Sequence, residues 1–194
     1  MRIYGRLWVA RLSGGAAALA VLLLAGCGGA VNVVSEGADS NLMLGGNDAV
    51  AYFTAGKAVP GSSEIKTEHR GLTYRFSSVE NRRQFITSPE RYVPQFGGFS
   101  ANGMVYAIPV VVDADSFKII DGKLYLFEGE RAKRYFEMDQ ETNLKRAWHY
   151  WDSEVKDSNW GLQTLKRTLI RVPHYRTDEE LAKDYEKRFG RQPG

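Results

Sequence analysis

Apolar and polar residues alternate over residues 72–76 (LTYRF), which predicts a β-strand with one buried face. The runs 117–120 (FKII) and 123–127 (KLYLF) flank Asp121-Gly122, a dipeptide favoured in type I′ turns, and therefore predict a β-hairpin. Residues 105–112 are apolar and β-branched but contain a proline, which is typical of an edge strand or a bulged strand. The middle of the chain is thus expected to form short antiparallel strands.

Two helix starts are expected between the predicted strands. Ser77 is followed three residues later by Glu80, as in a capping box, and Phe85 would lie on the buried face of the helix that follows. Ser88-Pro89 marks a second, short helix, because proline is favoured at the first helical position. Interleaved strands and helices predict an α+β fold in which a hairpin and short strands pack with helices.

The C-terminal part of the chain has a helical pattern. Thr177 is expected to cap a helix with Glu180 at the matching position, and Gly190 is expected to end it. Between them runs an apolar stripe with four-residue spacing: Leu181, Tyr185 and Phe189. We expect this helix to belong to a helical extension over residues 161–194 that packs on the domain. Docking on a partner is the alternative.

Residues 1–26 have the composition of a signal peptide: three arginines, an apolar stretch over 16–25, and small residues before Cys27. That stretch is shorter than the roughly 20 apolar residues that a membrane-spanning helix needs, so a retained transmembrane helix is disfavoured. The sequence Leu24-Ala25-Gly26-Cys27 resembles the lipobox of bacterial lipoproteins, in which the cysteine is lipidated and becomes the first mature residue. An ordinary secretory signal and an uncleaved anchor are the alternatives.

Lipidation of Cys27 would attach the protein to a membrane. The multiply acylated cysteine that a lipobox implies is a stable anchor, because two or more acyl chains hold firmly where one binds marginally. Gly28 is not the aspartate of the enterobacterial retention signal, so the resemblance implies the periplasmic face of the outer membrane.

The basic character of the chain comes from its first residues. The sequence has 26 Lys and Arg and 23 Asp and Glu, and residues 1–26 contain three of the basic residues and none of the acidic ones. The mature chain would therefore be formally neutral, and no nucleic-acid partner is expected. Because Cys27 is the only cysteine, its acylation would leave no thiol for a disulfide, a thiolate metal site or a cysteine nucleophile.

Residues 28–41 are rich in Gly, Ala, Ser and Asn, so residues 27–41 are expected to form a flexible tether with a reach of about 20 Å. About 150 residues remain, which suits one ordinary domain with a sizeable core. No internal repeat is visible in the sequence.

Six short segments follow one another in the central part of the chain: 46–53 (GNDAVAYF), 71–76 (GLTYRF), 80–85 (ENRRQF), 88–92 (SPERY), 94–98 (PQFGG) and 121–126 (DGKLYL). Their order and spacing resemble the YHS domain-containing proteins over residues 42–160. The resemblance implies a small α+β domain of the exported bacterial branch of this family, in which the biochemical function is generally unassigned.

Related YHS modules that handle metals carry cysteines where, by alignment of the motifs, this chain has Ala51, Ser77 and Asn81. These residues cannot supply the thiolates that a soft metal prefers. The exported branch commonly has a cysteine after its Gly-Gly-aromatic motif, whereas this chain has Ser100, which lacks the nucleophilicity that thiol redox chemistry needs. No redox activity is therefore expected, and the missing Gly-x-Ser-x-Gly motif argues against a serine hydrolase.

Two kinds of candidate site remain. A metal site with oxygen and nitrogen ligands would use Asp48 and His69, although no metal-binding spacing is present and Asp48 beside a turn is more typical of a backbone cap. We therefore expect no cofactor. A ligand pocket would combine aromatic side chains with the Gly-Gly motif. Its candidate residues are Asp48, Tyr52, Tyr74, Tyr92, Gly97, Gly98 and Ser100.

Core packing is the favoured interpretation of the aromatic candidates, and a tight turn or a close backbone approach is the favoured interpretation of Gly97 and Gly98. Together the patterns predict a lipid-anchored cell-envelope protein that acts as a non-catalytic binding or accessory module. Its expected partners are the membrane, through the anchor, and an envelope protein, through residues 161–194. A metal-binding or metal-delivery protein with oxygen and nitrogen ligands is the alternative.

Overall fold

The computed structural model describes residues 29–194. The predicted signal peptide (1–26) and the predicted lipidation site, Cys27, lie outside the described residues. Of the described residues, 45% are helical and 23% are in strands, which confirms the predicted α+β fold. Within this part of the chain, no helix is long and apolar enough to cross a membrane.

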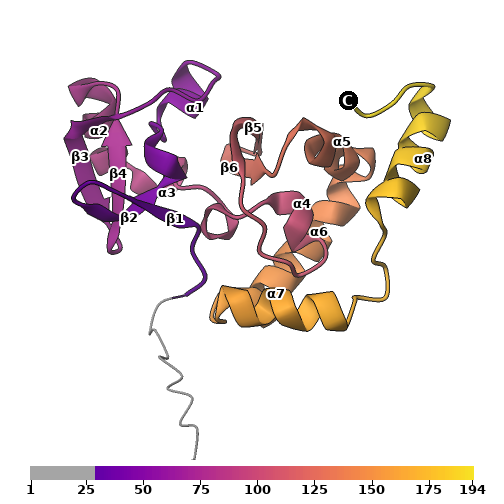
Figure 1. Ribbon diagram of the computed structural model, residues 1–194. Coiled ribbons are helices and arrows are strands. Elements are labelled where there is room, and N and C mark those ends of the chain that lie inside the picture. Colours follow the sequence, from indigo (N-terminus) through magenta and orange to yellow (C-terminus); the bar gives the residue numbers. More distant parts are fainter. Residues whose placement is uncertain (1–28) are drawn as a thin grey trace, which may run out of the picture.

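A four-stranded sheet dominates the first half of the described chain (Figure 1). Its strands are β1 (Val33–Glu36), β2 (Asp39–Met43), β3 (Ser62–His69) and β4 (Leu72–Phe76). Their order is β1-β2-β4-β3, with β2 and β4 parallel and the other neighbours antiparallel. Three helices complete this half: α1 (Ala51–Thr54), α2 (Val79–Thr87) and α3 (Pro89–Tyr92).

The second half contains a two-stranded hairpin and most of the helices (Figure 1). Its elements are α4 (Ala101–Met104), β5 (Asp113–Ile120), β6 (Lys123–Phe127), α5 (Glu130–Met138), α6 (Gln140–Tyr150), α7 (Trp160–Leu169) and α8 (Asp178–Phe189). A π-helical turn, Trp151–Val155, continues α6. The predicted hairpin around Asp121-Gly122 and the predicted C-terminal helix with its Thr177–Glu180 capping box are confirmed.

Strand β6 separates two hydrophobic cores. Leu124 and Leu126 pack into the core beneath the four-stranded sheet, which we call the first core. Tyr125 and Phe127 pack into the second core, which is formed with α5 and α6. Successive side chains of a strand point to opposite faces, so a strand that is buried on both faces is apolar throughout. This explains why residues 123–127 show an almost continuous apolar run instead of an alternation.

The two halves repeat one structural unit. In residues 44–87 and again in residues 96–138, a 3-10 turn is followed by a short helix, a hairpin with a left-handed two-residue turn, and a nine-residue helix. The backbone matches in detail: the φ angles are 59°, 58° and 83° over residues 44–46, and 54°, 58° and 82° over residues 96–98. We call residues 44–87 the first module and residues 96–138 the second module.

The modules also share their central aromatic pair. Phe76 at the end of the first hairpin lies 5.2 Å from Phe85, and Phe127 at the end of the second lies 5.4 Å from Phe136, measured between ring centroids. No repeat is visible in the sequence, but the structure contains one. Only turn glycines and a few core residues are common to both modules, and so few shared positions do not stand out in the sequence.

The predicted flexible tether over residues 27–41 is wrong from Val33 onward, because β1 and the start of β2 lie within it. Val31 and Val33 pack against the first core, and Gly37 turns the chain with a φ of 60°. The small and polar composition of this stretch obscured its β-branched residues, which are the ones that the sheet buries.

Two local predictions are corrected. Helix α2 is capped by Ser78 and not by Ser77, and the Ser78 Oγ accepts a hydrogen bond from the Asn81 backbone N–H. Ser77 instead bonds to Asp48, as described below. Residues 105–112 form a loop and not an edge strand, since Ala107 adopts a φ of 59° and the Ile108 N–H bonds back to the Gly103 carbonyl.

Candidate functional site

A cleft of about 300 Å³ lies between the second module and the C-terminal segment. One wall consists of α4, the loop after it, and the first turns of α5. The other wall is the segment from Tyr175 to Leu181, which includes the start of α8. Apolar side chains, among them Ile108 and Val110, line part of its surface, and charged groups of both signs join them.

A carboxylate bound by two side chains lies in this cleft. Glu128 follows β6, and its two oxygens accept hydrogen bonds from the Ser100 Oγ and from the Asn102 Nδ2, the latter at 3.0 Å. Ser100 is fully buried and also caps α4 by accepting a bond from the Gly103 N–H. Glu128 therefore connects the end of the hairpin to the short helix and presents its remaining surface to the cleft.

The first module contains the same connection with its chemical groups exchanged. Asp48 precedes α1 as Ser100 precedes α4, and Ser77 follows β4 as Glu128 follows β6. The Ser77 Oγ donates to the Asp48 Oδ2 at 2.6 Å. In the first module the carboxylate therefore precedes the short helix and the hydroxyl follows the hairpin, whereas in the second module the positions of the two groups are reversed. Asp48 is fully buried, whereas Glu128 reaches a cleft, and this difference makes the second module the one with an accessible acidic group.

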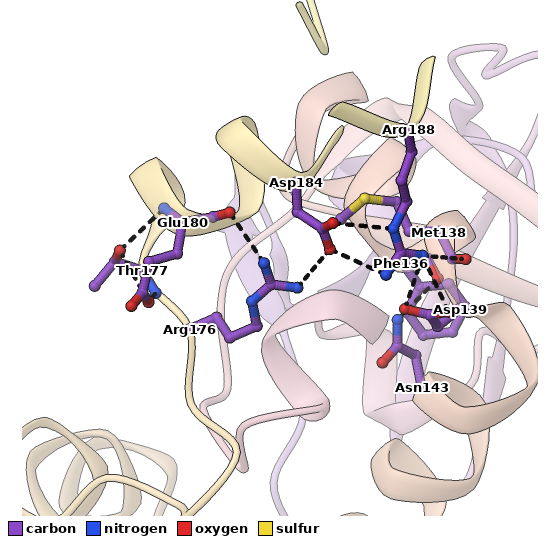
Figure 2. Close-up of polar contacts among 9 residues, drawn as sticks. All are labelled: Phe136, Met138, Asp139, Asn143, Arg176, Thr177, Glu180, Asp184 and Arg188. Carbon is purple, nitrogen blue, oxygen red and sulfur yellow. Dashed lines mark hydrogen bonds and ion pairs between the residues drawn. The ribbon is translucent and has the colours of Figure 1, made fainter. Parts of the chain in front are cut away.

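Two arginines contribute cationic groups to the cleft. Arg131 of α5 places its Nη1 3.3 Å from the Asp178 Oδ2, and its Nε bonds to the backbone oxygen of Gly194 at 3.2 Å. Arg176 donates to the Asp184 Oδ2 at 2.9 Å and to the Glu180 carbonyl at 3.0 Å (Figure 2). Both side chains remain partly exposed, so each guanidinium group is accessible to a ligand.

The wall that carries Arg176 is fixed in place by α8. Figure 2 shows Arg188 between Asp184 on its own helix and Asp139 at the junction of α5 and α6. Arg188 also donates to the Met138 carbonyl at 3.3 Å. Hydrogen bonding from Arg176 is the main cause that lowers the pKa of Asp184, so this carboxylate remains charged between the two arginines.

Tyrosine hydroxyls add neutral donors and acceptors. Tyr106, Tyr135 and Tyr175 line the cleft, and burial raises the pKa of Tyr106 and of Tyr135. Both hydroxyls are therefore protonated near neutral pH. Tyr135 also packs against Leu181, which joins α5 to α8 through a small hydrophobic cluster.

His174 lies at the back of this wall. Its Nε2 lies 2.9 Å from the Val105 carbonyl oxygen, which can only accept, so this nitrogen carries the proton. The ring stacks against Tyr106 and Tyr150, at centroid distances of 5.9 and 5.8 Å. Burial is the main cause that lowers the pKa of His174 below its ordinary value of 6.5, and the positive charge of Arg146 acts in the same direction.

Acidification is expected to destabilise the wild-type protein more than a His174→Gln variant. Because the folded state lowers this pKa, the unfolded state binds the proton more readily, and stability is lost as the pH falls from about 6.5 toward the folded pKa. Melting temperatures measured from about pH 7.5 to 5 should show the wild-type value falling relative to that of His174→Gln. A difference that does not change with pH would contradict a neutral, partly buried His174.

The structure places the sequence-predicted pocket residues apart from this cleft. Tyr52, Tyr74 and Tyr92 are buried in the first core, together with Asp48 beneath α1. Ser100 is the exception, since it contacts the cleft residue Glu128.

Gly97 and Gly98 hold the start of the described chain. The Asn32 N–H donates to the Gly97 carbonyl at 2.8 Å, and the Asn32 Nδ2 donates to the Gly98 carbonyl at 3.0 Å. A Cβ on Gly97 would lie 2.3 Å from the Ala30 carbonyl oxygen, and its φ of 58° disfavours any other residue. The close approach that the sequence suggested is confirmed.

The two candidate metal ligands do not meet. The Asp48 oxygens accept bonds from Val50, Ala51, Ser77 and Asn81, whereas the His69 Nε2 lies 3.2 Å from the Glu90 Oε1. Among residues 29–194, no group of three or more His, Cys, Asp or Glu side chains is arranged to hold a metal ion.

Comparisons with family models, with curated proteins and with solved structures found no match. The cleft is therefore interpreted from its own chemistry. Glu128, Arg131, Arg176 and the three tyrosines were not identified from the sequence. No motif marks them, because the cleft forms between segments that are distant along the chain.

Proposed function

We propose that the protein is a lipid-anchored protein of the cell envelope that binds a small organic acid in the cleft between its second module and its C-terminal segment. The observation that carries this proposal is the combination of two accessible guanidinium groups with an apolar surface in one cleft of about 300 Å³. This volume lies at the lower end of the range for small-molecule sites.

The chemistry of the cleft favours a carboxylate. Guanidinium groups bind carboxylates through paired, charge-assisted hydrogen bonds, and Arg131 and Arg176 lie on opposite walls. Ile108, Val110 and Leu181 would contact an apolar body, while Tyr106 and Tyr175 offer ring faces and hydroxyls. A compact acid with an aliphatic or aromatic body suits this arrangement.

Binding without catalysis is the proposed activity. Ser100 is fully buried and its hydroxyl donates a hydrogen bond to Glu128, so a substrate could not reach this hydroxyl as a nucleophile. The Nε2–H of His174 donates a hydrogen bond to the Val105 carbonyl, and the imidazole ring is stacked between two tyrosines. Neither residue is positioned for acid–base work on a ligand in the cleft.

The envelope location rests on the signal-peptide pattern and the lipobox resemblance at Cys27. The order of the YHS-like segments over residues 42–160 supports membership of the exported branch of that family. A metal-binding function is less supported, because the Asp48 oxygens are already satisfied by five donors within the first module.

Binding of small acids tests this proposal. A panel of aliphatic and aromatic monocarboxylic acids, each paired with its primary amide, would be titrated and followed by thermal shift and native mass spectrometry. We expect at least one acid to bind about tenfold more tightly than its amide, because the amide cannot pair ionically with the arginines. Replacing both Arg131 and Arg176 with glutamine should remove that preference.

A matched control is Arg83→Gln, since Arg83 is an exposed, ion-paired arginine on α2 and far along the chain from the cleft. It should retain the full preference for the acid. If no acid binds, or if the double variant prefers acids as strongly as the wild type does, the proposed ligand class is incorrect.

A further inference from the structure

Helix α7 packs against the protein with its polar side. Its buried residues are Gln163 and Arg167, which lie one turn apart. The Gln163 Nε2 donates to the Ala107 carbonyl at 3.0 Å, and Arg167 pairs with Glu154 of the preceding π-helical turn. A surface helix of a water-soluble domain normally buries its apolar side, so the orientation of α7 is inverted.

The apolar side of α7 is exposed as a consequence. Leu162, Leu165 and Leu169 share one side of the helix and are 55 to 74% exposed. Trp160, the first residue of α7, and Ile170, just after its end, are 51 and 65% exposed. These five make up half of the ten large apolar side chains that are exposed within residues 29–194. Isolated exposed apolar residues are ordinary on protein surfaces, but a concentration on one helix marks a contact surface.

The described chain begins beside this helix. The Ala30 N–H donates to the Lys156 carbonyl at 2.8 Å, and Lys156 precedes Trp160 by only four residues. In Figure 1, α7 and the first described residues lie at the same end of the molecule. Cys27 is three residues before Ala30, and a chain of that length spans at most about 10 Å.

The charge around α7 suits anionic lipid headgroups. Lys166 and Arg171 are exposed basic residues near this face, whereas Arg167 is buried against Glu154. Interfacial helices combine a Trp- and Leu-rich apolar face with Lys and Arg at its borders, and each cation near an anionic surface adds favourable energy.

We propose that the exposed face of α7, formed by Leu162, Leu165 and Leu169, inserts into the surface of an anionic bilayer. The helix would lie in the plane of the membrane, with these leucines in the acyl region. This inference shares with the proposed function only the anchor at Cys27 and does not depend on ligand binding in the cleft. A membrane contact at α7 would fix the orientation of the domain, which an anchor alone leaves free.

The test uses the full chain, in which acylation of Cys27 leaves a new cysteine as the free thiol. Leu165→Cys and, as the matched control, Ile86→Cys on α2 have nearly equal exposure, at 55 and 54%. Each protein is reconstituted in vesicles of phosphatidylethanolamine and phosphatidylglycerol, and the rate of labelling by a membrane-impermeant maleimide is measured for both variants. We expect Leu165→Cys to react about tenfold more slowly than Ile86→Cys.

Equal labelling rates of Leu165→Cys and Ile86→Cys in vesicles would overturn the proposal. Protection that increases with protein concentration, together with a dimer in analytical ultracentrifugation, would also overturn it, because a second copy would then cover α7. The wild-type chain is labelled in parallel as a control for the anchor. Its only cysteine is Cys27, so any labelling of it would show that Cys27 is not acylated. Leu165→Glu with Leu169→Glu should remove the protection of a Leu162→Cys reporter, whereas Val79→Glu with Ile86→Glu should not.

Discussion

Replacing Phe136 with alanine is expected to lower the free energy of unfolding by about 3–5 kcal/mol. Phe136 is fully buried and joins α5 to the second hairpin through Phe127, so its removal leaves a cavity between the two elements. Such cavities are costly because a close-packed core relaxes only partly around them. Denaturant unfolding followed by circular dichroism would measure the loss.

Phe189→Ala is the matched control, because this phenylalanine lies at the end of α8 and is half exposed. Its replacement should cost less than about 1 kcal/mol. Phe85→Ala, at the equivalent position of the first module, should cost about as much as Phe136→Ala. If Phe136→Ala were no more harmful than Phe189→Ala, the second module would not have the core described above.

Replacing Asp48 with alanine is expected to destabilise the protein by about 3 kcal/mol or more. The carboxylate accepts bonds from the Val50 and Ala51 N–H groups and, on its other oxygen, from the N–H and Oγ of Ser77 and the Nδ2 of Asn81. Alanine would leave the buried N–H groups of Val50 and Ala51 without an acceptor, and the three donors of Ser77 and Asn81 would lose theirs as well. Unsatisfied buried donors each cost on the order of 1–3 kcal/mol.

Asp48→Asn should be nearly as harmful, because the asparagine NH2 group cannot accept hydrogen bonds. It would face N–H and O–H donors that bond to a carboxylate oxygen in the wild-type protein. Asp152→Ala removes an aspartate whose contact is an exposed ion pair with Lys156, and it should change stability by no more than about 1 kcal/mol. Thermal and urea unfolding of the three variants would compare them directly. A stable, well-folded Asp48→Ala variant would show that the first module does not depend on this acceptor.

Local sequence signals predicted those elements whose structure is decided by a few neighbouring residues. Asp121-Gly122 adopts the left-handed turn that the dipeptide favours, with φ angles of 50° and 71°, and Thr177 and Glu180 form their capping box. Ser77 was misassigned as a cap because its partner, Asp48, is distant along the chain. The same limit applies to β1, whose pairing with β2 and packing on the first core are tertiary effects.

The candidate site was less predictable than the fold. The sequence directed attention to Asp48 and the Gly-Gly motif, and the structure assigns these to a buried acceptor and to a close backbone contact. The cleft depends on how the segment from Tyr175 to Leu181 lies against the second module. The duplication was hidden for a related reason: the Ser77–Asp48 bond and the Ser100–Glu128 bond occupy equivalent places with their residues exchanged.

With the proposed anchor at Cys27, the N-terminal segment has a mechanical consequence. Residues 30–32 are bonded to Lys156, Gly97 and Gly98 in the second half, and the chain then enters the sheet of the first half as β1. A pull on the anchor would load these backbone bonds first, and the sheet only after they had broken. The Gly97-Gly98 turn would thus act as a clamp that shields the first module from tension at the membrane.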